Sequence, residues 1–381
     1  MSDTSIAHDS ALSVPPALPF WLSLIIVPVT IIAALYGGWT LLLLPVSTWW
    51  LFLLLDVILG ADTSNADPRT QESALFWHRA ITIIWFPVQF CLIFGTLYWV
   101  TVTDHLNTLE ELILFFGVGI ASGTIGINYA HELCHQRSAH ERLMADLLLG
   151  SVLYSHFRSE HVLVHHRYVA TPRDPVTARY NESFFKFYAR VIPGCFKSAF
   201  EVEKAQLARK GLPWWDQQNP FWRYAALQLL FLEIAIIIGG FWGLLLFVYQ
   251  AATAVFQLEL VDYVEHYGLT RKHLGDGKYE PIKPRHSWNA DFKSSNWLLI
   301  NLQRHSDHHY NPTRRFPLLQ TYSDEEAPQL PFSYPLMTLA ALYPRLWRKW
   351  MNPRVLAWRQ RYYPEITEWV HYKRGTTPWP K

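Results

Sequence analysis

The chain of 381 residues contains six apolar runs, each long enough to cross a lipid bilayer. About 20 residues of α-helix span the hydrocarbon layer of a membrane. Only Arg223, at the edge of the fifth run, brings a Lys or Arg into them. The pattern therefore predicts an all-α integral membrane protein with six transmembrane helices. Gly37-Gly38 and Gly239-Gly240 separate consecutive runs and predict two tight helical hairpins. The runs are residues 18–36, 39–59, 81–103, 109–130, 222–238 and 241–261.

The positive charges lie on one side of this predicted bundle. Residues 131–221 and 263–381 hold almost all of the 33 Lys and Arg, whereas the turns at 37–38 and 239–240 and the loop 104–108 hold none. Cytoplasmic loops carry such an excess, so we expect both termini and the basic blocks to face the cytoplasm. We expect one membrane domain, residues 18–371, with a helical cap made of blocks 131–221 and 262–371. A segment 1–17 precedes this domain and a tail 372–381 follows it.

Composition excludes several other classes of protein. The net charge of +2 gives no reason to expect nucleic-acid binding. The three cysteines, Cys91, Cys134 and Cys195, form no Cys-x-x-Cys pair, which argues against an iron–sulfur cluster or a zinc ribbon. Residues 1–16 contain no Lys or Arg and so lack the basic start of a cleaved signal peptide.

Eight of the 17 histidines fall in three short clusters next to the apolar runs. Residues four apart share one face of a helix, close enough to bind one metal ion. A single such pair is more often structural, but three clusters predict a metal site, and eight histidines exceed the coordination of one ion. Neutral imidazole suits zinc, copper, iron or nickel. The clusters are His131 with His135, His161 with His165 and His166, and His305 with His308 and His309.

The first cluster also fits the His-Glu-x-x-His motif of zinc proteases, in which the glutamate is the general base. That interpretation leaves the other two clusters without a role, and we do not favour it. Four stretches together resemble the membrane alkane 1-monooxygenases, within the histidine-box di-iron enzymes that include fatty-acid desaturases. They are residues 128–135 (NYAHELCH), 160–166 (EHVLVHH), 262–269 (DYVEHYGL) and 302–309 (LQRHSDHH).

The resemblance implies two iron ions held by nine histidines. His266, which stands alone at the end of the sixth run, is a candidate only through this resemblance. The implied ligands are His131, His135, His161, His165, His166, His266, His305, His308 and His309.

Two of the boxes depart from the usual pattern of this family, in which Gly often precedes the second histidine of the first box and the paired histidines of the second. Here Cys134 and Val164 occupy those places, and Gln136 replaces a common Lys. We expect Cys134 to pack and Val164 to fill space beside the metal.

Two iron(II) ions with neutral ligands need nearby carboxylates to offset their charge and orient the imidazole N–H groups. Five acidic residues lie within a few residues of a histidine in the boxes. Each could equally be solvated, but together they favour the orienting role. They are Glu132, Glu160, Asp262, Glu265 and Asp307.

The implied reaction is hydroxylation of the terminal methyl of a medium-chain n-alkane by O2, giving a 1-alkanol. The resemblance implies electrons from rubredoxin and its NAD(P)H-dependent reductase, and a bacterial inner membrane. Arg314 and Arg315 are candidates for docking that carrier, although a solvated loop is the simpler interpretation.

The substrate would enter from the membrane lipid. Trp49, Trp50, Phe52 and Leu55 could line its channel, although ordinary packing explains each of them equally well. Residues 56–62 (DVILGAD) also resemble the family, but nothing in the sequence assigns them a role.

Two other functions remain open from sequence. A fatty-acid desaturase or a methyl-aromatic (xylene-type) hydroxylase would share the fold and the metal, and the last box and residues 265–269 favour the alkane enzyme. A metal transporter or a non-catalytic metal-binding protein would place its site near the bilayer midplane, whereas these clusters lie at and beyond helix ends.

Overall fold

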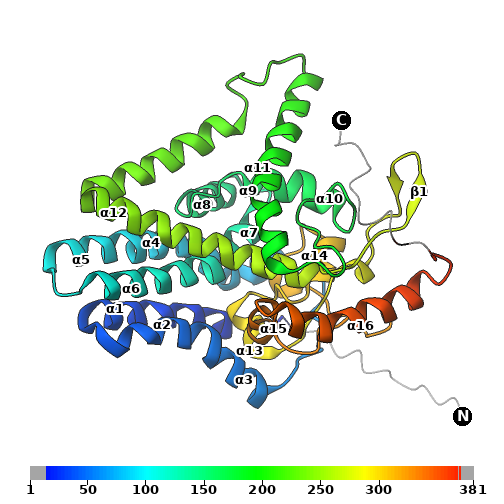
Figure 1. Cartoon of the computed structure of the whole chain (residues 1–381), viewed down its shortest axis with the longest axis horizontal. Coiled ribbons are helices and arrows are strands. Elements are labelled where there is room, and N and C mark those ends of the chain that lie inside the picture. The colour runs from blue at the N-terminus through cyan, green and yellow to red at the C-terminus, as the bar shows by residue number, and fades with distance from the viewer. Residues whose placement is uncertain (1–13, 368, 370–381) are drawn as a thin grey trace, which may run out of the picture.

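The computed structural model describes residues 14–367 and residue 369. Most of the predicted segment 1–17 and all of the tail 372–381 lie outside these residues. The fold is mostly helical, and five helical stretches are long and apolar enough to cross a membrane, which makes this an integral membrane protein. Figure 1 shows them lying roughly parallel in one bundle. They are Leu18–Tyr36, Gly38–Leu59, Glu72–Thr103, Thr108–Cys134 and Pro220–His266.

Each stretch is built from shorter elements. The first is η1 (Leu18–Ile25) and α1 (Ile26–Tyr36); the second is η2 (Gly38–Leu42), α2 (Leu43–Pro45), η3 (Val46–Trp50) and α3 (Leu51–Leu59). The third is η4 (Glu72–Leu75), α4 (Phe76–Phe90), η5 (Cys91–Gly95) and α5 (Thr96–Thr103). The fourth is α6 (Thr108–Ala121), η6 (Ser122–Ile127) and α7 (Asn128–Cys134), and the fifth is α12 (Pro220–His266).

The fifth stretch consists of two helical segments, with the break where the sequence predicted it. α12 turns back at Gly240, where the backbone is not helical (φ 60°, ψ −150°). Figure 1 shows the resulting two arms, which meet at one end of the bundle. A positive φ favours glycine, and Gly37 (φ 60°) and Gly38 (φ 57°) turn the chain at the same end. The predicted glycine breaks are therefore confirmed.

Local signals explain where the fourth stretch begins and why it packs closely. The side chain of Asn107 accepts hydrogen bonds from the N–H groups of Leu109 and Glu110, and Glu110 bonds back to the N–H of Asn107. This reciprocal cap satisfies donors that the first helical turn leaves free. Further along, Gly119 and Gly123 let the second arm of α12 approach. A Cβ at Gly119 would lie 2.6 Å from the carbonyl oxygen of Gln250.

Apart from α8 and the outer part of α11, the remaining elements gather at the end of the bundle opposite the glycine turns (Figure 1). α8 packs beside α4, α7 and α12. The helices are α8 (Ala139–Gly150), α9 (Phe157–Glu160), η7 (His161–His165), α10 (His166–Tyr168), α11 (Phe184–Arg209), η8 (Pro284–His286), α13 (Lys293–Leu298), α14 (His305–Tyr310), η9 (Phe316–Leu318), α15 (Tyr334–Ala341) and α16 (Pro344–Tyr362). β1 (His273–Gly275) and β2 (Lys278–Tyr279) form an antiparallel hairpin in which His273 pairs with Tyr279.

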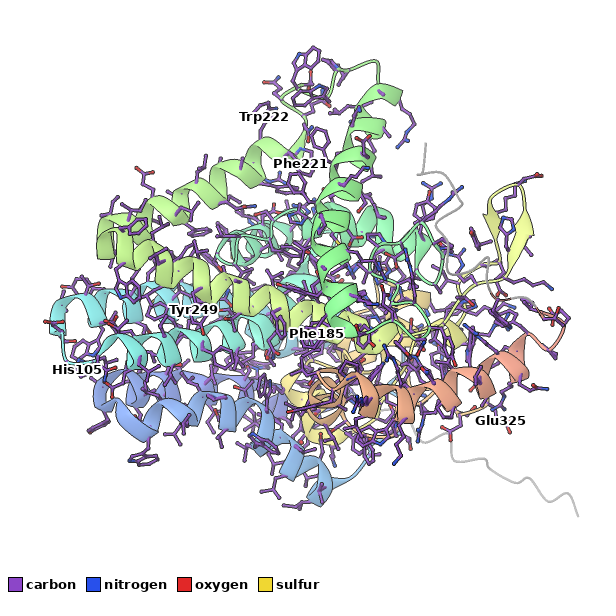
Figure 2. All side chains as sticks on the ribbon, in the orientation of Figure 1. His105, Phe185, Phe221, Trp222, Tyr249 and Glu325 are labelled. Carbon is purple, nitrogen blue, oxygen red and sulfur yellow. The ribbon has the colours of Figure 1, made fainter. Side chains whose placement is uncertain are left out.

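Two hydrophobic clusters form the cores of the bundle and of the elements at its histidine-bearing end. The larger contains buried residues of the bundle such as Phe94, Phe115 and Phe247. The second joins α11, the end of α12, α15 and α16 through residues such as Phe187, Tyr263 and Trp347. Trp347 is thus a core residue of this second cluster. Trp214 and Trp215 are exposed instead, near Trp222 at the outer end of α12 in Figure 2.

Candidate metal centre

Four segments bring the nine candidate histidines together. His131 lies in the last turn of α7 and His135 directly follows that helix, while His266 is the last residue of α12. η7 and α10 carry the second box, and α14 carries the third. All these elements meet at the end of the bundle opposite the glycine turns (Figure 1).

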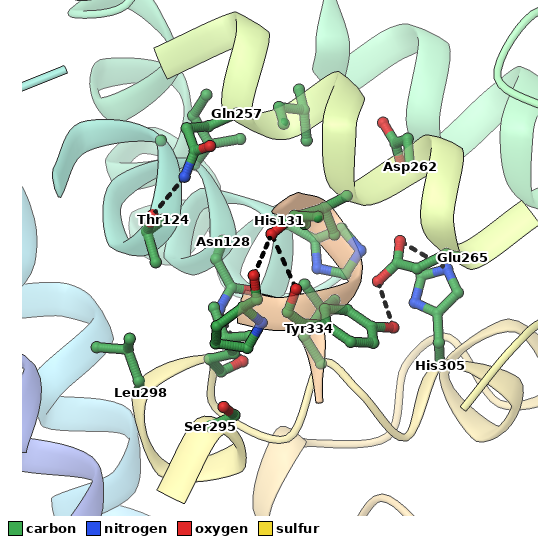
Figure 3. Close-up of a pocket in the computed structure, with 18 of the residues that line it drawn as sticks. Thr124, Asn128, His131, Gln257, Asp262, Glu265, Ser295, Leu298, His305 and Tyr334 are labelled. Carbon is green, nitrogen blue, oxygen red and sulfur yellow. Dashed lines mark hydrogen bonds and ion pairs between the residues drawn. The ribbon is translucent and has the colours of Figure 1, made fainter. Parts of the chain in front are cut away.

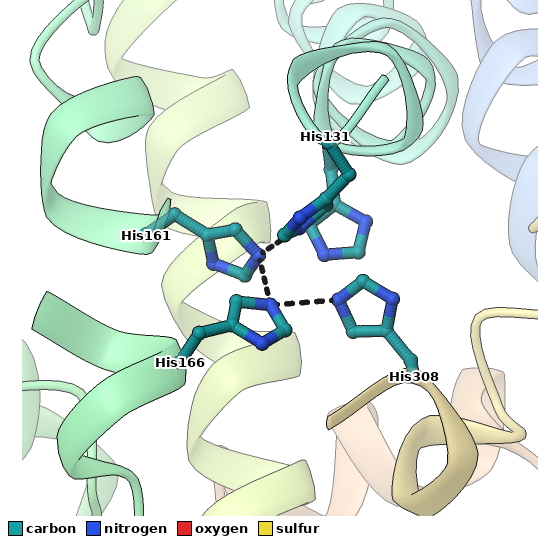
Figure 4. Close-up of side chains that lie close together, drawn as sticks. His131, His161, His166 and His308 are labelled. Carbon is teal, nitrogen blue, oxygen red and sulfur yellow. Dashed lines mark hydrogen bonds between the residues drawn. The ribbon is translucent and has the colours of Figure 1, made fainter. Parts of the chain in front are cut away.

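The first group of histidines contains five side chains whose candidate ligand nitrogens all lie within 4.8 Å of one another. Its members are His131, His135, His161, His166 and His308. The Nε2 atom of His161 lies 3.0 Å from that of His135 and 3.0 Å from that of His166. The Nε2 atom of His166 lies 3.0 Å from that of His308. Figure 4 shows these rings pointing toward a common centre.

The second group of histidines contains the other four, His165, His266, His305 and His309, again within 4.8 Å. The Nε2 atom of His305 lies 3.1 Å from that of His266 and 3.0 Å from that of His309. All four side chains are buried.

Hydrogen bonding between the rings cannot account for these contacts. Burial lowers the pKa of His161, His166 and His308 well below the ordinary value, and that of His135 to about 3, so these rings are neutral. A neutral ring nitrogen donates or accepts one hydrogen bond, yet Nε2 of His161 has two nitrogen neighbours. Nitrogens bound at about 2.1 Å to one ion, at right angles, lie about 3.0 Å apart. The observed spacing therefore fits a metal ion in each group.

A π-helical turn distributes the second box between the two groups. η7 spans His161–His165, so His161 and His166 point into the first group while His165 points into the second. Such turns add a residue to a helical turn and are frequent at functional sites. Two successive histidines, His165 and His166, thus belong to different groups.

Two carboxylates contact histidines of the second group. Asp174 lies 3.0 Å from Nδ1 of His165 and also accepts hydrogen bonds from Thr177 and from the N–H of Val176. Glu265 lies 3.3 Å from Nε2 of His305 and accepts a hydrogen bond from Tyr334 at 2.9 Å.

Sequence reasoning proposed Glu265 but missed Asp174 and Tyr334. Both stand apart from the boxes along the chain, and no spacing signal marked them. The Asp-Pro pair at residues 174–175, which favours a turn back toward the second box, is the weak signal that could have found Asp174.

The other four predicted carboxylates have different surroundings. Asp262 groups with Glu265 and His266. Glu132 accepts a hydrogen bond from Gln136 at 2.9 Å, and Asp307 bonds to Arg314, Asn311 and Tyr322. Oε1 of Glu160 is buried and has no hydrogen-bond partner in the described part of the chain.

The residues that depart from the family pattern pack in the protein. Val164 is fully buried in a small cluster with Tyr168 and with Val202 of α11. Cys134 is buried and directs its Sγ to the carbonyl oxygen of His131.

The two arginines after the last box, which the sequence offered as candidates for docking an electron carrier, form ion pairs within the protein. Arg315 is 7 % exposed and bonds to Glu141 at 2.7 Å and to Glu72 at 3.2 Å. Arg314 lies 2.5 Å from the carboxylate of Asp307. Their positive charges are therefore neutralised internally.

One cavity reaches both groups of histidines (Figure 3). His131 and His161 of the first group and His305 of the second lie in its wall. The rest of the wall comes mainly from the bundle and α13, with apolar side chains such as Ile127, Leu258, Val261, Leu298, Leu299 and Leu302.

A few polar side chains also line the cavity, including Asn128, Thr124 and Gln257, and Gln257 donates to Thr124 at 3.1 Å. Of the four predicted channel residues, Trp49 lines this cavity. Trp50 is 54 % exposed on the bundle surface, Phe52 is buried in the core, and Leu55 lies outside the cavity wall.

Comparisons with known proteins agree with this arrangement. Residues 111–341 match the fatty acid desaturase family. The chain is 37 % identical to alkane 1-monooxygenase 1 of Alcanivorax borkumensis over 353 residues, covering 89 % of this chain and 85 % of that protein. It is 36 % identical to an alkane 1-monooxygenase of Pseudomonas putida, covering 84 % and 80 % of the two chains. It is also 28 % identical to the hydroxylase component of a P. putida xylene/toluene monooxygenase, covering 91 % and 90 %.

Proposed function

The chain belongs to the alkane 1-monooxygenase family of membrane enzymes, and from this we propose that it hydroxylates the terminal methyl of medium-chain n-alkanes at a histidine-bound di-iron centre. The observation that carries the proposal is the mostly apolar cavity whose wall includes histidines of both groups. A cavity of this kind buries an alkyl chain and leaves only its end beside the metal-binding side chains.

The nine histidines would hold the two ions, five around one and four around the other. Iron bound there would activate O2, so that one oxygen atom enters a terminal C–H bond while two electrons and two protons reduce the other to water. Imidazole suits iron, and the surrounding carboxylates would offset its charge.

The chain's own residues would position the ligands and the substrate. Asp174 would accept the Nδ1–H of His165 and leave its Nε2 free to bind metal, and that Nε2 is buried without a hydrogen-bond partner within the described residues. Leu258, Leu298 and Leu299 would exclude water from the alkyl chain.

We propose that the site faces the cytoplasm of a bacterial inner membrane, with α12 crossing twice and six crossings in all. The excess of Lys and Arg at the histidine end of the bundle supports this orientation. Residues 18–371 would then form one domain whose substrate enters from the lipid.

We further propose reduced rubredoxin, supplied by an NAD(P)H-dependent reductase, as the electron donor. Because Arg314 and Arg315 are bound internally, its docking would use other cations, such as Arg167. This side chain is exposed beside His166 and lies 5.2 Å over the ring of Tyr168. An acidic carrier would be steered to such a surface.

Product analysis tests the proposal. Membranes containing the protein receive rubredoxin, rubredoxin reductase, NADH and n-octane, and the products are identified by gas chromatography. We expect the wild-type protein to form 1-octanol and the variants His131→Ala and His308→Ala to form none. The control variant His140→Ala, which changes an exposed histidine outside both groups, should give a normal yield. An alkene would instead indicate a desaturase. Hydroxylation of xylene alone would indicate the methyl-aromatic activity that the more distant relative is named for.

A further inference from the structure

Residues 56–62, which sequence reasoning left without a role, hold the segment that leads to the last histidine box. The N–H of Asp62 donates to the carbonyl oxygen of Asp291 at 2.7 Å, and that of Lys293 donates to Gly60 at 3.0 Å. Arg304, which directly precedes His305, donates to the carbonyl oxygen of Asp62 at 2.9 Å. The end of the second membrane stretch is thereby fixed to the metal-bearing part of the chain.

Asp56 makes the most concentrated set of these contacts. It lies near the end of α3 and is 2 % exposed. Its Oδ1 accepts hydrogen bonds from the hydroxyl of Ser294 at 2.5 Å and from the N–H of Ser295 at 2.9 Å. Its Oδ2 accepts a third from the hydroxyl of Ser295. A buried carboxylate with three donors from one neighbouring segment holds that segment in one position.

The segment that Asp56 holds is a wall of the cavity. α13 contributes Ser295 and Leu298, and Leu299 directly follows it. Asn128, one turn before His131, donates to the carbonyl oxygen of Leu299 at 2.7 Å and so links this wall to the first box. Trp49, on the same membrane stretch as Asp56, lines the cavity directly.

We propose that Asp56 is a positioning residue that fixes the α13 wall of the cavity and thereby determines which alkyl chain lengths reach the histidines. This inference rests on the proposed function. Removing the carboxylate takes both side-chain and backbone partners from Ser295 and leaves Ser294 only the carbonyl oxygen of Phe52, and the wall can then retreat and admit a longer chain. A displacement of about 1 Å near a reacting group can change rates by roughly a hundredfold.

The test is a competition between n-octane and n-dodecane in one reaction, because the ratio of the two alcohols does not depend on the amount of active enzyme. Asp56→Ala should raise the ratio of 1-dodecanol to 1-octanol by about tenfold, the lower end of what one methylene contributes in an apolar pocket. Ser294→Ala removes one of the three hydrogen bonds without touching the cavity wall and should shift the ratio less. Asp104→Asn, at the exposed far end of the bundle, should leave it unchanged.

The iron content of each variant separates positioning from a general structural role. Wild-type iron with an altered product ratio supports the proposal. An unchanged product ratio overturns the proposal, whatever the iron content of the variants. If the variants lose iron in proportion to activity, Asp56 supports only the metal centre or the fold.

If the wild-type protein forms no alcohol, the proposed function fails. The same variants are then compared by the ratio of dodecane to octane that remains bound to purified protein. Asp56→Ala should still raise this ratio, and an unchanged ratio overturns the inference.

Discussion

Individual carboxylates control how the histidines present their nitrogens. Asp174 is buried and accepts from Nδ1 of His165, Oγ1 of Thr177 and the N–H of Val176. An N–H donated from Nδ1 fixes the tautomer whose Nε2 carries the free lone pair. Asp174 would therefore prepare His165 for a metal, although it lies outside every histidine box.

Asp174→Asn tests this role. An amide has one acceptor oxygen, so it can serve His165 or Val176 but must present its NH2 to the other. We expect the affinity for iron to fall by about 10- to 100-fold, measured as iron retained per chain in competition with a chelator. Glu201→Gln, on the exposed side of α11, is the matched control. Equal retention by both variants would contradict the role given to Asp174.

At this scale the sequence predicted the residues of the boxes and little beyond them. Spacing alone identified eight histidines, because residues three or four apart share a helix face. It could not find His266, which has no neighbour at ligand spacing and which the family resemblance supplied. It also could not anticipate that the turn η7 would direct His165 and His166 into different groups, because the period of a helix does not reveal an inserted residue.

The packing of whole helices depends on glycines in the fourth stretch. A Cβ at Gly119 would lie 2.6 Å from the carbonyl oxygen of Gln250, and one at Gly123 would lie 2.7 Å from that of Ala254. Backbone atoms of α12 cannot move aside as a flexible side chain can. Small residues at this spacing let membrane helices approach closely, so α6 and the second arm of α12 require both glycines.

Gly119→Ala should therefore destabilise the protein by about 1–3 kcal/mol, the usual cost of overpacking. The measurement is the midpoint of thermal unfolding in detergent. Gly95→Ala provides the comparison, since a Cβ there meets no atom within 4 Å. A midpoint for Gly119→Ala that equals that of Gly95→Ala would show that the helices separate at little cost.

Elements of the cap are joined by a second buried carboxylate. Glu280, after β2, accepts from Arg285 at 2.6 Å and from the N–H of Lys272 at 2.8 Å, and it also bonds to Tyr363 beyond α16. Burial raises its pKa, but hydrogen bonds from His286, Lys272 and Tyr363 outweigh burial and hold the pKa below its ordinary value of 4.5.

A lowered pKa means that the ionised form is bound more tightly in the folded protein than in the unfolded chain. This stabilisation is present above pH 4.5 and is lost as the pH falls through the folded pKa. We expect Glu280→Gln to cost roughly 1–3 kcal/mol near pH 7, with the difference from wild type shrinking below pH 4.5. Unfolding midpoints of both proteins across this range provide the measurement, and a difference that stays constant with pH would contradict the assignment.

Contacts between distant segments illustrate a second limit of sequence reasoning. Hydropathy located the membrane stretches because lipid imposes a minimum apolar length. It did not reveal that Arg315 would be neutralised by Glu72 and Glu141. This outcome depends on neighbours distant in the chain, which local composition does not specify.

Across the whole molecule, metal binding should contribute to stability. The nine histidines come from four separate segments of the chain. An ion that binds only the folded protein stabilises it by mass action, by about 2.7 kcal/mol when the free ion concentration is a hundred times the dissociation constant. Removing iron with a chelator should therefore lower the unfolding midpoint and abolish hydroxylation, and iron(II) should restore both. His308→Ala with His309→Ala should melt at the same temperature with or without iron. A wild-type midpoint insensitive to chelation would mean that the fold holds the histidines in place unaided.

The distribution of the histidines along the chain also has a consequence for biosynthesis. Translation delivers His131 and His161 early, His266 only at the end of α12, and α14 later still. Neither group is complete until α14 has emerged and docked against the bundle, so metal loading is a late step that follows membrane insertion. A ribosome that stops before α14 leaves a protein without a complete metal site, and occupancy of the centre thus reports that translation has passed α14.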